Sequence, residues 1–134
     1  MLRSAKIKIA VYGQSLLANS NLLTGLNRKF NVFACTSLNQ VRQTLESTSI
    51  KILLIEIGTN GKELKILKEV HTKNPRLRVI ALGQEEPKEN LIKAYKYGSK
   101  DFFKMPFNEA LLIERIEGIV RRNKQQSTLI LTGG

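Results

Sequence analysis

The sequence of 134 residues contains one cysteine, one histidine and no tryptophan, and the first two scarcities exclude whole classes of site. Cys35 has no partner for an internal disulfide and no companion at the spacing of metal ligands. With His71 as the single histidine, no Ser-His-Asp or Cys-His arrangement can be assembled, and we expect that the chain is not an enzyme. Low cysteine content is typical of a reducing compartment, so we expect a cytoplasmic protein.

Long apolar runs and acidic residues are also scarce. No segment approaches the ~20 apolar residues of a membrane span, and the first residues lack the apolar block of a secretory signal. Twenty-two Lys and Arg stand against eleven Asp and Glu, a formal net charge of +11 that favours acidic partners. The basic residues are dispersed along the chain without an arginine-rich tract, so we expect no specific nucleic-acid binding by this domain alone.

Short apolar runs alternate with amphipathic segments along most of the chain. The runs predict strands over 6–12, 32–36, 50–57, 77–82 and 101–104. Helical spacing of apolar residues predicts a helix after each strand: one capped by Ser15 and ending at Asn31, one capped by Ser37 or Asn39, and others over 62–73, 87–97 and 108–122. The run 50–57 is the most hydrophobic and suits a central strand buried on both faces.

Five strand–helix units in succession predict a parallel sheet with helices on both of its faces. Ligands of such sheets bind at the carboxyl ends of the strands, so the residues after each apolar run are the candidate site. We expect one domain over 1–122. Residues 123–134 show no helical stripe and are interpreted as a tail or a linker, with 127–132 as a further short strand.

Residues 94–107 carry a spacing that resembles the last signature of response-regulator receiver domains. That family has Ala, three residues, Gly-Ala, one residue, Asp-Tyr, two residues and Lys-Pro-Phe. The present chain has Ala94, Gly98-Ser99, Asp101-Phe102 and Met105-Pro106-Phe107 at the same spacing. The resemblance covers about residues 6–122 and implies a flavodoxin-like (βα)5 three-layer sandwich, with a five-stranded parallel sheet in the order 2-1-3-4-5.

The resemblance also implies a phosphorylation site, which this sequence does not reproduce. The family uses two acidic residues for magnesium, an aspartate that accepts a phosphoryl group, a hydroxyl, and a lysine before a cis-proline. The corresponding positions hold Tyr12 and Gly13, Glu56, Gly83, and Met105, with Pro106 as the expected cis-proline. We therefore expect that magnesium binding and phosphotransfer are lost, that Glu56 is the only carboxylate in the pocket, and that no other cofactor is bound.

Two residues near this pocket, Glu56 and Phe102, keep two interpretations each. Glu56 either imitates a phosphorylated aspartate or is a carboxylate held by a hydrogen bond or by Lys104. Lys104 precedes Met105 by one residue, and strand alternation points it to the opposite side, so it is not expected to replace the family's lysine. Phe102 falls at the position of the family's switch aromatic, and the alternative is that it simply packs.

The resemblance favours a signalling module that binds a protein partner without being phosphorylated. The family commonly associates through its fourth helix, fifth strand and fifth helix. Here that face is basic, which favours an acidic partner over a homodimer, and it contains Lys93, Lys96, Lys100, Lys104, Arg115 and Arg121. The alternative is the N-terminal regulatory domain of a DNA-binding transcriptional regulator. A small-molecule binder is a third hypothesis, but the sequence has no phosphate-binding loop of specific form.

Overall fold

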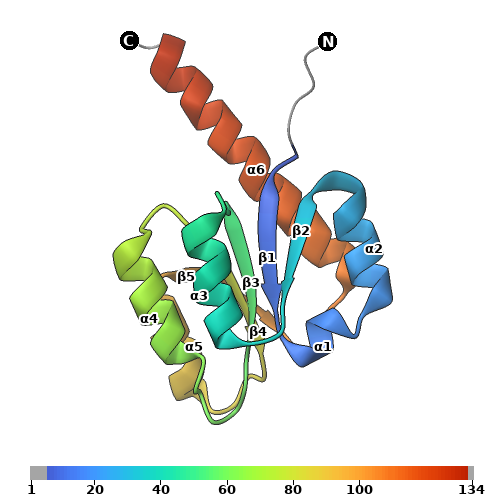
Figure 1. Ribbon diagram of the computed structural model, residues 1–134, viewed down its shortest axis with the longest axis vertical. Helices are drawn as coiled ribbons and strands as arrows, with labels where there is room; N and C mark the ends of the chain where they lie inside the picture. The colour runs from blue at the N-terminus through green and yellow to red at the C-terminus, as the bar shows by residue number, and fades with distance from the viewer. Residues whose placement is uncertain (1–5, 133–134) are drawn as a thin grey trace.

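A computed structural model describes the backbone of residues 6–132 and the side chains of residues 6–122. Within these described residues there are five strands and six helices, and each strand is followed by one helix or, after the first strand, by two (Figure 1). The strands are β1 (Lys8–Tyr12), β2 (Asn31–Cys35), β3 (Ile52–Ile57), β4 (Arg78–Gly83) and β5 (Ser99–Lys104). The helices are α1 (Gln14–Leu17), α2 (Ser20–Lys29), α3 (Leu38–Ser47), α4 (Leu64–Lys73), α5 (Lys88–Lys96) and α6 (Glu109–Thr132).

The strands form one parallel sheet in the order β2-β1-β3-β4-β5, which confirms the expected topology. Helices α3, α4 and α5 cover one face of the sheet, and α1, α2 and α6 cover the other (Figure 1). The chain therefore has three layers, with β3 in the middle of the sheet and β2 and β5 at its edges.

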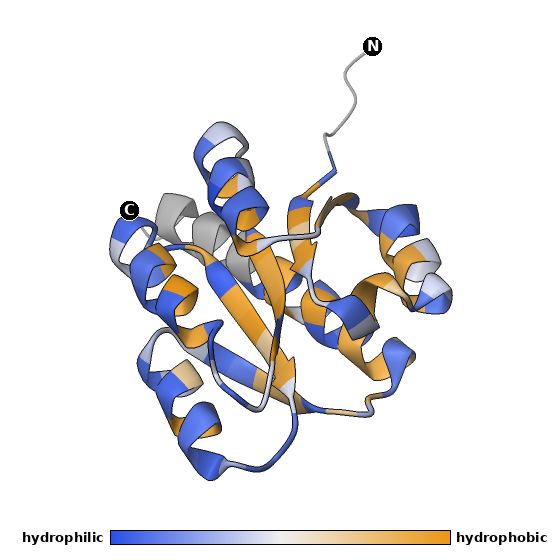
Figure 2. Cartoon of the chain, turned by 60° about the horizontal axis from the view of Figure 1, so that its bottom comes forward, coloured by the Kyte–Doolittle hydropathy of each residue, from blue (hydrophilic) through white to orange (hydrophobic). Residues whose placement is uncertain are grey.

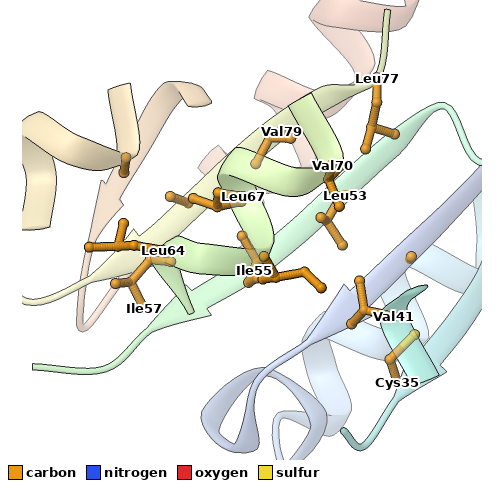
Figure 3. Packing of buried hydrophobic residues seen from close by; sticks show 14 of the residues in the cluster. Cys35, Val41, Leu53, Ile55, Ile57, Leu64, Leu67, Val70, Leu77 and Val79 are labelled. Atoms are coloured by element: carbon orange, nitrogen blue, oxygen red, sulfur yellow. The ribbon is translucent and has the colours of Figure 1, made fainter. Parts of the chain in front are cut away.

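Strand β3 shows why this sequence buries both faces of the sheet. Leu53 and Ile55 pack under α3 and α4, while Ile52 and Leu54 point to the opposite core under α1, α2 and α6. Figure 3 shows the first of these cores, where Leu67 and Val70 of α4 lie against the strands. In Figure 2 the central strands are largely orange, and the outward sides of the helices are mostly blue. Alternation therefore places Glu56 on the face of α1.

The expected helix from Ser15 to Asn31 is wrong in one respect, because the structure divides it. α1 ends at Leu17, and α2 begins after Asn19, whose side chain accepts the Leu22 N–H at 3.0 Å. An asparagine that caps α2 satisfies an otherwise unpaired N–H, which allows the chain to change direction at this point. Ser15 caps no helix, and its N–H and hydroxyl are bound to Glu56 instead.

The C-terminal region also differs from the expectation. No strand forms over 127–132, since α6 continues to Thr132. The interpretation of 123–134 as a tail or a linker stays a prediction, and residues 133–134 lie outside the described residues. On α4, His71 is exposed, and the buried residues are Leu64, Ile66, Leu67 and Val70. In the part of the chain that the structure describes, no helix is both long and apolar enough to cross a bilayer.

Candidate functional site at the carboxyl ends of the strands

The register of the sheet brings the predicted positions to one edge. Glu56 is paired with Leu82 of β4, and one residue further Ile57 is paired with Gly83. Gly83 is paired in turn with Lys104 at the end of β5. Tyr12 ends β1, with Gly13 directly after it. The ends of β1, β3, β4 and β5 therefore place the substituted positions of the expected pocket at the same edge of the sheet.

Ser15 holds the Glu56 carboxylate through both of its oxygens. The backbone N–H of Ser15 donates to Glu56 Oε1 at 2.9 Å, and its hydroxyl donates to Oε2 at 2.9 Å. Sequence reasoning left two candidates for the group that holds Glu56, an unspecified hydrogen bond or Lys104. The structure shows that it is Ser15, a residue 41 positions earlier in the chain.

Gly13 gives the Glu56 side chain the space that it occupies. Its φ of 145° lies in a region that side-chain-bearing residues rarely adopt. A Cβ atom added to Gly13 would lie 2.5 Å from Glu56 Cβ and 2.6 Å from its Oε1. The volume that a side chain at position 13 would fill is thus taken by the glutamate.

A second carboxylate, which the sequence analysis missed, lies near Tyr12. Glu63 is buried, with 5% of its surface exposed, and its Oε1 accepts the Gly58 N–H at 3.0 Å. Burial raises the pKa of the Tyr12 hydroxyl above its ordinary value, and the negative charges of Glu63 and then Glu56 raise it further. The expectation that Glu56 is the only carboxylate in the pocket is therefore wrong.

Phe102 and Gly83 are packed against each other. A Cβ atom at Gly83 would lie 3.5 Å from Phe102 Cζ and 2.8 Å from the Ile57 carbonyl oxygen. Phe102 is half-buried and packs against the core under α3, α4 and α5. Because position 83 is a glycine, it offers no hydroxyl group. The Phe102 ring fills the space beside this glycine.

Met105 and Lys104 point in different directions at the end of β5, as alternation predicts. Met105 is half-buried and packs against the core that contains α6, whereas Lys104 is exposed and its Nζ lies 3.2 Å from Glu85 Oε2. The Met105–Pro106 peptide bond is cis, as the resemblance implies. Lys104 is thus paired at the surface and does not hold Glu56.

The predicted basic face lies along α5, β5 and α6. Lys93, Lys96, Lys100, Lys104, Arg115 and Arg121 are all exposed. Arg115 Nη1 lies 3.6 Å from Asp101 Oδ1, and the other oxygen of Asp101 is 3.2 Å from Arg78 Nη2. Asp101 therefore links β5 to both β4 and α6. This residue of the 94–107 signature has a structural role here.

Two curated proteins that are similar to the chain are regulatory proteins. No family model matches the chain. It is 30% identical to the "Regulatory protein VanRB" of Enterococcus faecalis over 100 residues, which cover 71% of this chain and 43% of that protein. It is 24% identical to the "Transcriptional regulatory protein QseB" of Escherichia coli O157:H7 over 132 residues, 96% of this chain and 59% of that one. The chain spans about half the length of these relatives.

Solved structures of receiver domains share the fold. A CheY-like receiver domain protein from Methanospirillum hungatei superposes with a TM-score of 0.79 at 16% identity, over 92% of this chain and 99% of that one. A Francisella response-regulator receiver domain gives 0.73 at 19% identity, over 88% and 99%. The chain therefore has the fold of response-regulator receiver domains, and its sequence is similar to those of regulatory proteins.

Proposed function

We propose that the chain is a receiver domain of the response-regulator type, and an atypical one, which regulates through protein contacts and is not switched by phosphorylation. The observation that carries the proposal is the position of the Glu56 carboxylate, which packs on Gly13 and is bound by Ser15 through both oxygens. Because both of its oxygens accept hydrogen bonds from Ser15, the Glu56 carboxylate links β3 to α1. It is not presented as a nucleophile toward a phosphoryl donor.

Magnesium does not fit the residues at this edge. The cation prefers octahedral oxygen coordination, usually with one or two carboxylates and several waters. Position 13 has no side chain and no room for one, and the described residues contain no group of three His, Cys, Asp or Glu placed to hold a metal. Glu63 does not compensate, because its Oε1 is bound to the Gly58 N–H.

The groups that would stabilise a phosphoryl product are also replaced. Phosphoryl transfer depends on positioned positive charge around the transferred oxygens. Met105 occupies the lysine position and packs into the core, while Lys104 is paired with Glu85 at the surface. Gly83 offers no hydroxyl, and the close packing of Phe102 beside it supports a packing role for that ring. We therefore propose that the domain binds no cofactor and catalyses no reaction. We also propose that it is located in the cytoplasm.

A phosphorylation assay tests this proposal. The protein is incubated with acetyl phosphate and magnesium, and the intact mass is measured against Glu56→Gln treated identically. We expect no mass gain in either protein. A phosphoryl adduct on the unmodified protein that is lost on treatment with acid or hydroxylamine, and is absent from Glu56→Gln, would show that Glu56 is an acceptor after all.

The second candidate function is the regulatory domain of a transcriptional regulator. It is favoured by the names of the two relatives and by the fact that the chain spans only about half of each. Under this hypothesis a DNA-binding domain follows Gly134 in the gene product. Sequencing the transcript beyond the Gly134 codon tests it, since an encoded helix-turn-helix supports it and an immediate stop codon contradicts it.

A further inference from the structure

The strands of the parallel sheet all begin at one end of the molecule, and basic residues stand at the starts of three of them. Lys8 opens β1, Lys51 directly precedes β3, and Arg78 opens β4. The Lys51 N–H donates to the Lys8 carbonyl at 2.9 Å, and the Arg78 N–H donates to the Lys51 carbonyl at 3.1 Å. Because neighbouring strands lie ~4.8 Å apart, these three residues form a close row across the amino end of the sheet, although they are far apart in the sequence.

Further cations extend this row on both sides. Lys6 Nζ donates to the Asn27 carbonyl at 3.2 Å, which places Lys6 beside the last turn of α2, where Arg28 is exposed. Arg76 is exposed in the segment that leads into β4, two residues before Arg78. We call five of these residues the amino-end patch, namely Lys6, Lys8, Arg28, Lys51 and Arg76.

Few acids neutralise the amino-end patch. Among the side chains that the structure describes, none of its five cations has a carboxylate within 4.0 Å. Lys29 and Arg78 lie beside the patch but are paired with Glu117 and Asp101, so they are not counted in it. Glu46 is exposed near the end of α3 and enters none of these ion pairs, so it lowers the charge of this end by one without pairing with a patch residue.

The opposite end of the molecule carries most of the acids. Six of the eleven acidic residues stand at the end of a strand, in the loop after it or in the first turn of the next helix, namely Glu56, Glu63, Glu85, Glu86, Glu89 and Glu109. The helix dipole favours acids at helix starts and bases at helix ends, which accounts for Arg28 in the last turn of α2. Lys6, Lys8 and Lys51 belong to no helix, so the dipole does not account for their charges.

Helix α6 runs from the acidic end to the basic end. Asn19 Nδ2, before α2, donates to Glu109 Oε1 at 3.4 Å, and Glu117 is paired with Lys29, the last residue of α2. The helix then continues to Thr132, past the amino end of the sheet (Figure 1). Under the second candidate function, the DNA-binding domain would therefore follow on the side of the molecule where the amino-end patch lies.

The chemistry of the patch suits the phosphate backbone of a nucleic-acid duplex. A duplex carries one negative charge per ~1.7 Å of its axis, and rows of Lys and Arg bind it without reading its sequence. The three exposed large apolar side chains of the described residues, Ile92, Tyr95 and Leu111, belong to other segments. The patch thus offers no apolar anchor for a protein interface and no exposed ring for stacking on unpaired bases.

From these observations we infer that the amino-end patch binds the phosphate backbone of a nucleic-acid duplex independently of its sequence. The dispersal of basic residues along the chain argued only against specific binding, and the parallel sheet gathers five of them at one end. Each contact pairs a lysine or arginine with a phosphate and releases a bound counterion, so the affinity depends steeply on salt. The inference goes beyond the proposed regulation through protein contacts and does not depend on it.

The test uses a fluorescein-labelled DNA duplex, titrated with the whole chain and followed by anisotropy at several salt concentrations. With one phosphate contact for each patch residue, the logarithm of the association constant should fall with the logarithm of the salt concentration at a slope of about −4.5. A second duplex of unrelated sequence should give the same affinity and slope. Lys51→Gln with Arg76→Gln should make the slope shallower by about 2 and weaken binding about tenfold at ~0.05 M salt.

The matched control is Lys62→Gln with Lys88→Gln, which removes the same charge from two exposed lysines at the opposite end of the molecule. We expect its slope to equal that of the unsubstituted protein and its affinity to stay within about twofold. Circular dichroism of both double variants shows whether they are folded. Their four side chains are all exposed, so we expect the spectra to be unchanged.

Four results would overturn the inference. They are no binding of either duplex at ~0.05 M salt, equal weakening by the control pair, a strong preference for one of the two duplexes, or tighter binding to phosphatidylserine vesicles through the same two residues. The assay contains neither a phosphoryl donor nor a protein partner, so its failure is separate from a failure of the proposed function. A phosphoryl adduct on Glu56 would refute the unphosphorylated state and leave the duplex result intact.

Discussion

Gly13 is the residue at which the smallest substitution should have the largest structural effect. Gly13→Ala places a Cβ atom 2.5 Å from Glu56 Cβ and forces a side chain into a φ of 145°. Overpacking and an unfavourable backbone region each cost ~1–3 kcal/mol, so we expect the free energy of unfolding to fall by about 3 kcal/mol. Urea denaturation followed by circular dichroism measures the change.

Gly118 supplies the control for that experiment. It lies inside α6, and a Cβ atom there would meet nothing closer than 3.8 Å. Replacing a glycine by alanine in an open helical position stabilises a protein by ~0.5–1 kcal/mol. Gly118→Ala should therefore raise the free energy of unfolding. A Gly13→Ala protein as stable as the unsubstituted one would mean that Glu56 does not occupy the space above position 13.

Tyr12 should ionise at higher pH than a free tyrosine, because burial and then the charges of Glu63 and Glu56 raise its pKa above 10.0. The difference in absorbance at alkaline pH between the unsubstituted protein and Tyr12→Phe isolates this group. Glu63→Gln keeps an oxygen that accepts the Gly58 N–H but removes one charge, so it should lower the Tyr12 pKa. A midpoint at or below 10.0 would contradict the placement of Tyr12.

The raised pKa of Tyr12 also has a consequence for stability. The folded chain holds the proton more tightly than the unfolded chain, so the stabilising contribution is complete below pH 10.0. It is lost as the pH rises from that value through the folded-state pKa. Tyr12→Phe should therefore show a weaker decline of stability with pH in this alkaline range.

At the residue level, the sequence identified positions but not contacts. Glu56, Gly83 and Met105 could be located because each follows or ends an apolar run, and a strand end is visible in a single sequence. The bond between Ser15 and Glu56 joins residues 41 positions apart, and no periodicity reports it. Glu63 was missed because it follows a polar turn rather than a strand, and its burial depends on how that turn folds back.

Among the elements, the loop between β3 and α4 is fixed by a residue of a different helix. Asn90 of α5 donates from Nδ2 to the carbonyls of Thr59 at 3.0 Å and Gly58 at 3.4 Å. Its Oδ1 would lie 2.8 Å from a Cβ atom at Gly61, where φ is 70°. The loop after the phospho-acceptor position is thus anchored to the helix that carries Ile92 and Tyr95.

Asn90→Ala should loosen this loop without unfolding the domain. Lost hydrogen bonds contribute ~0.5–1.5 kcal/mol each, offset in part by the better helix propensity of alanine, so we expect a net loss of about 1 kcal/mol. The Gly61 amide, which donates to the Gly58 carbonyl at 2.9 Å, should exchange faster with deuterium. Glu89→Ala, an exposed neighbour in the same helix, should leave that exchange rate unchanged.

Helix boundaries show why some elements were predictable and others were not. Ser37, one of the two caps that the sequence indicated for α3, accepts a backbone N–H three residues later at 3.0 Å, and Asn108 caps α6 in the same way. The break before α2 went unseen because its cap, Asn19, stands inside a stripe of leucines that is continuous with one longer helix. The end of α6 was missed because residues 123–132 have no apolar stripe, and a helix that leaves the core needs none.

For the whole molecule, the net charge of +11 bears on association more than on folding. The fold could be predicted from the alternation of strands and helices along the sequence. That pattern does not depend on the charge of the surface. The same charge is concentrated in part on the α5–β5–α6 face, where Lys93, Lys96 and Lys100 lack acidic partners among the described residues. A symmetric dimer through that face would bring these groups against their own copies.

We therefore expect the chain to be monomeric at low ionic strength, measured by sedimentation equilibrium over a wide range of protein concentration. Like charges repel over a Debye length of ~30 Å at 0.01 M salt and ~3 Å at 1 M, so any weak self-association should increase when salt is added. A dimer that is stable at low salt and dissociates at high salt would require acids interleaved with the lysines. Glu85 and Glu86 lie just before α5 and Glu89 lies within it, so these are the nearest acids in sequence to the lysines. Lys93→Glu with Lys96→Glu should then weaken such a dimer, because the acids would face like charges.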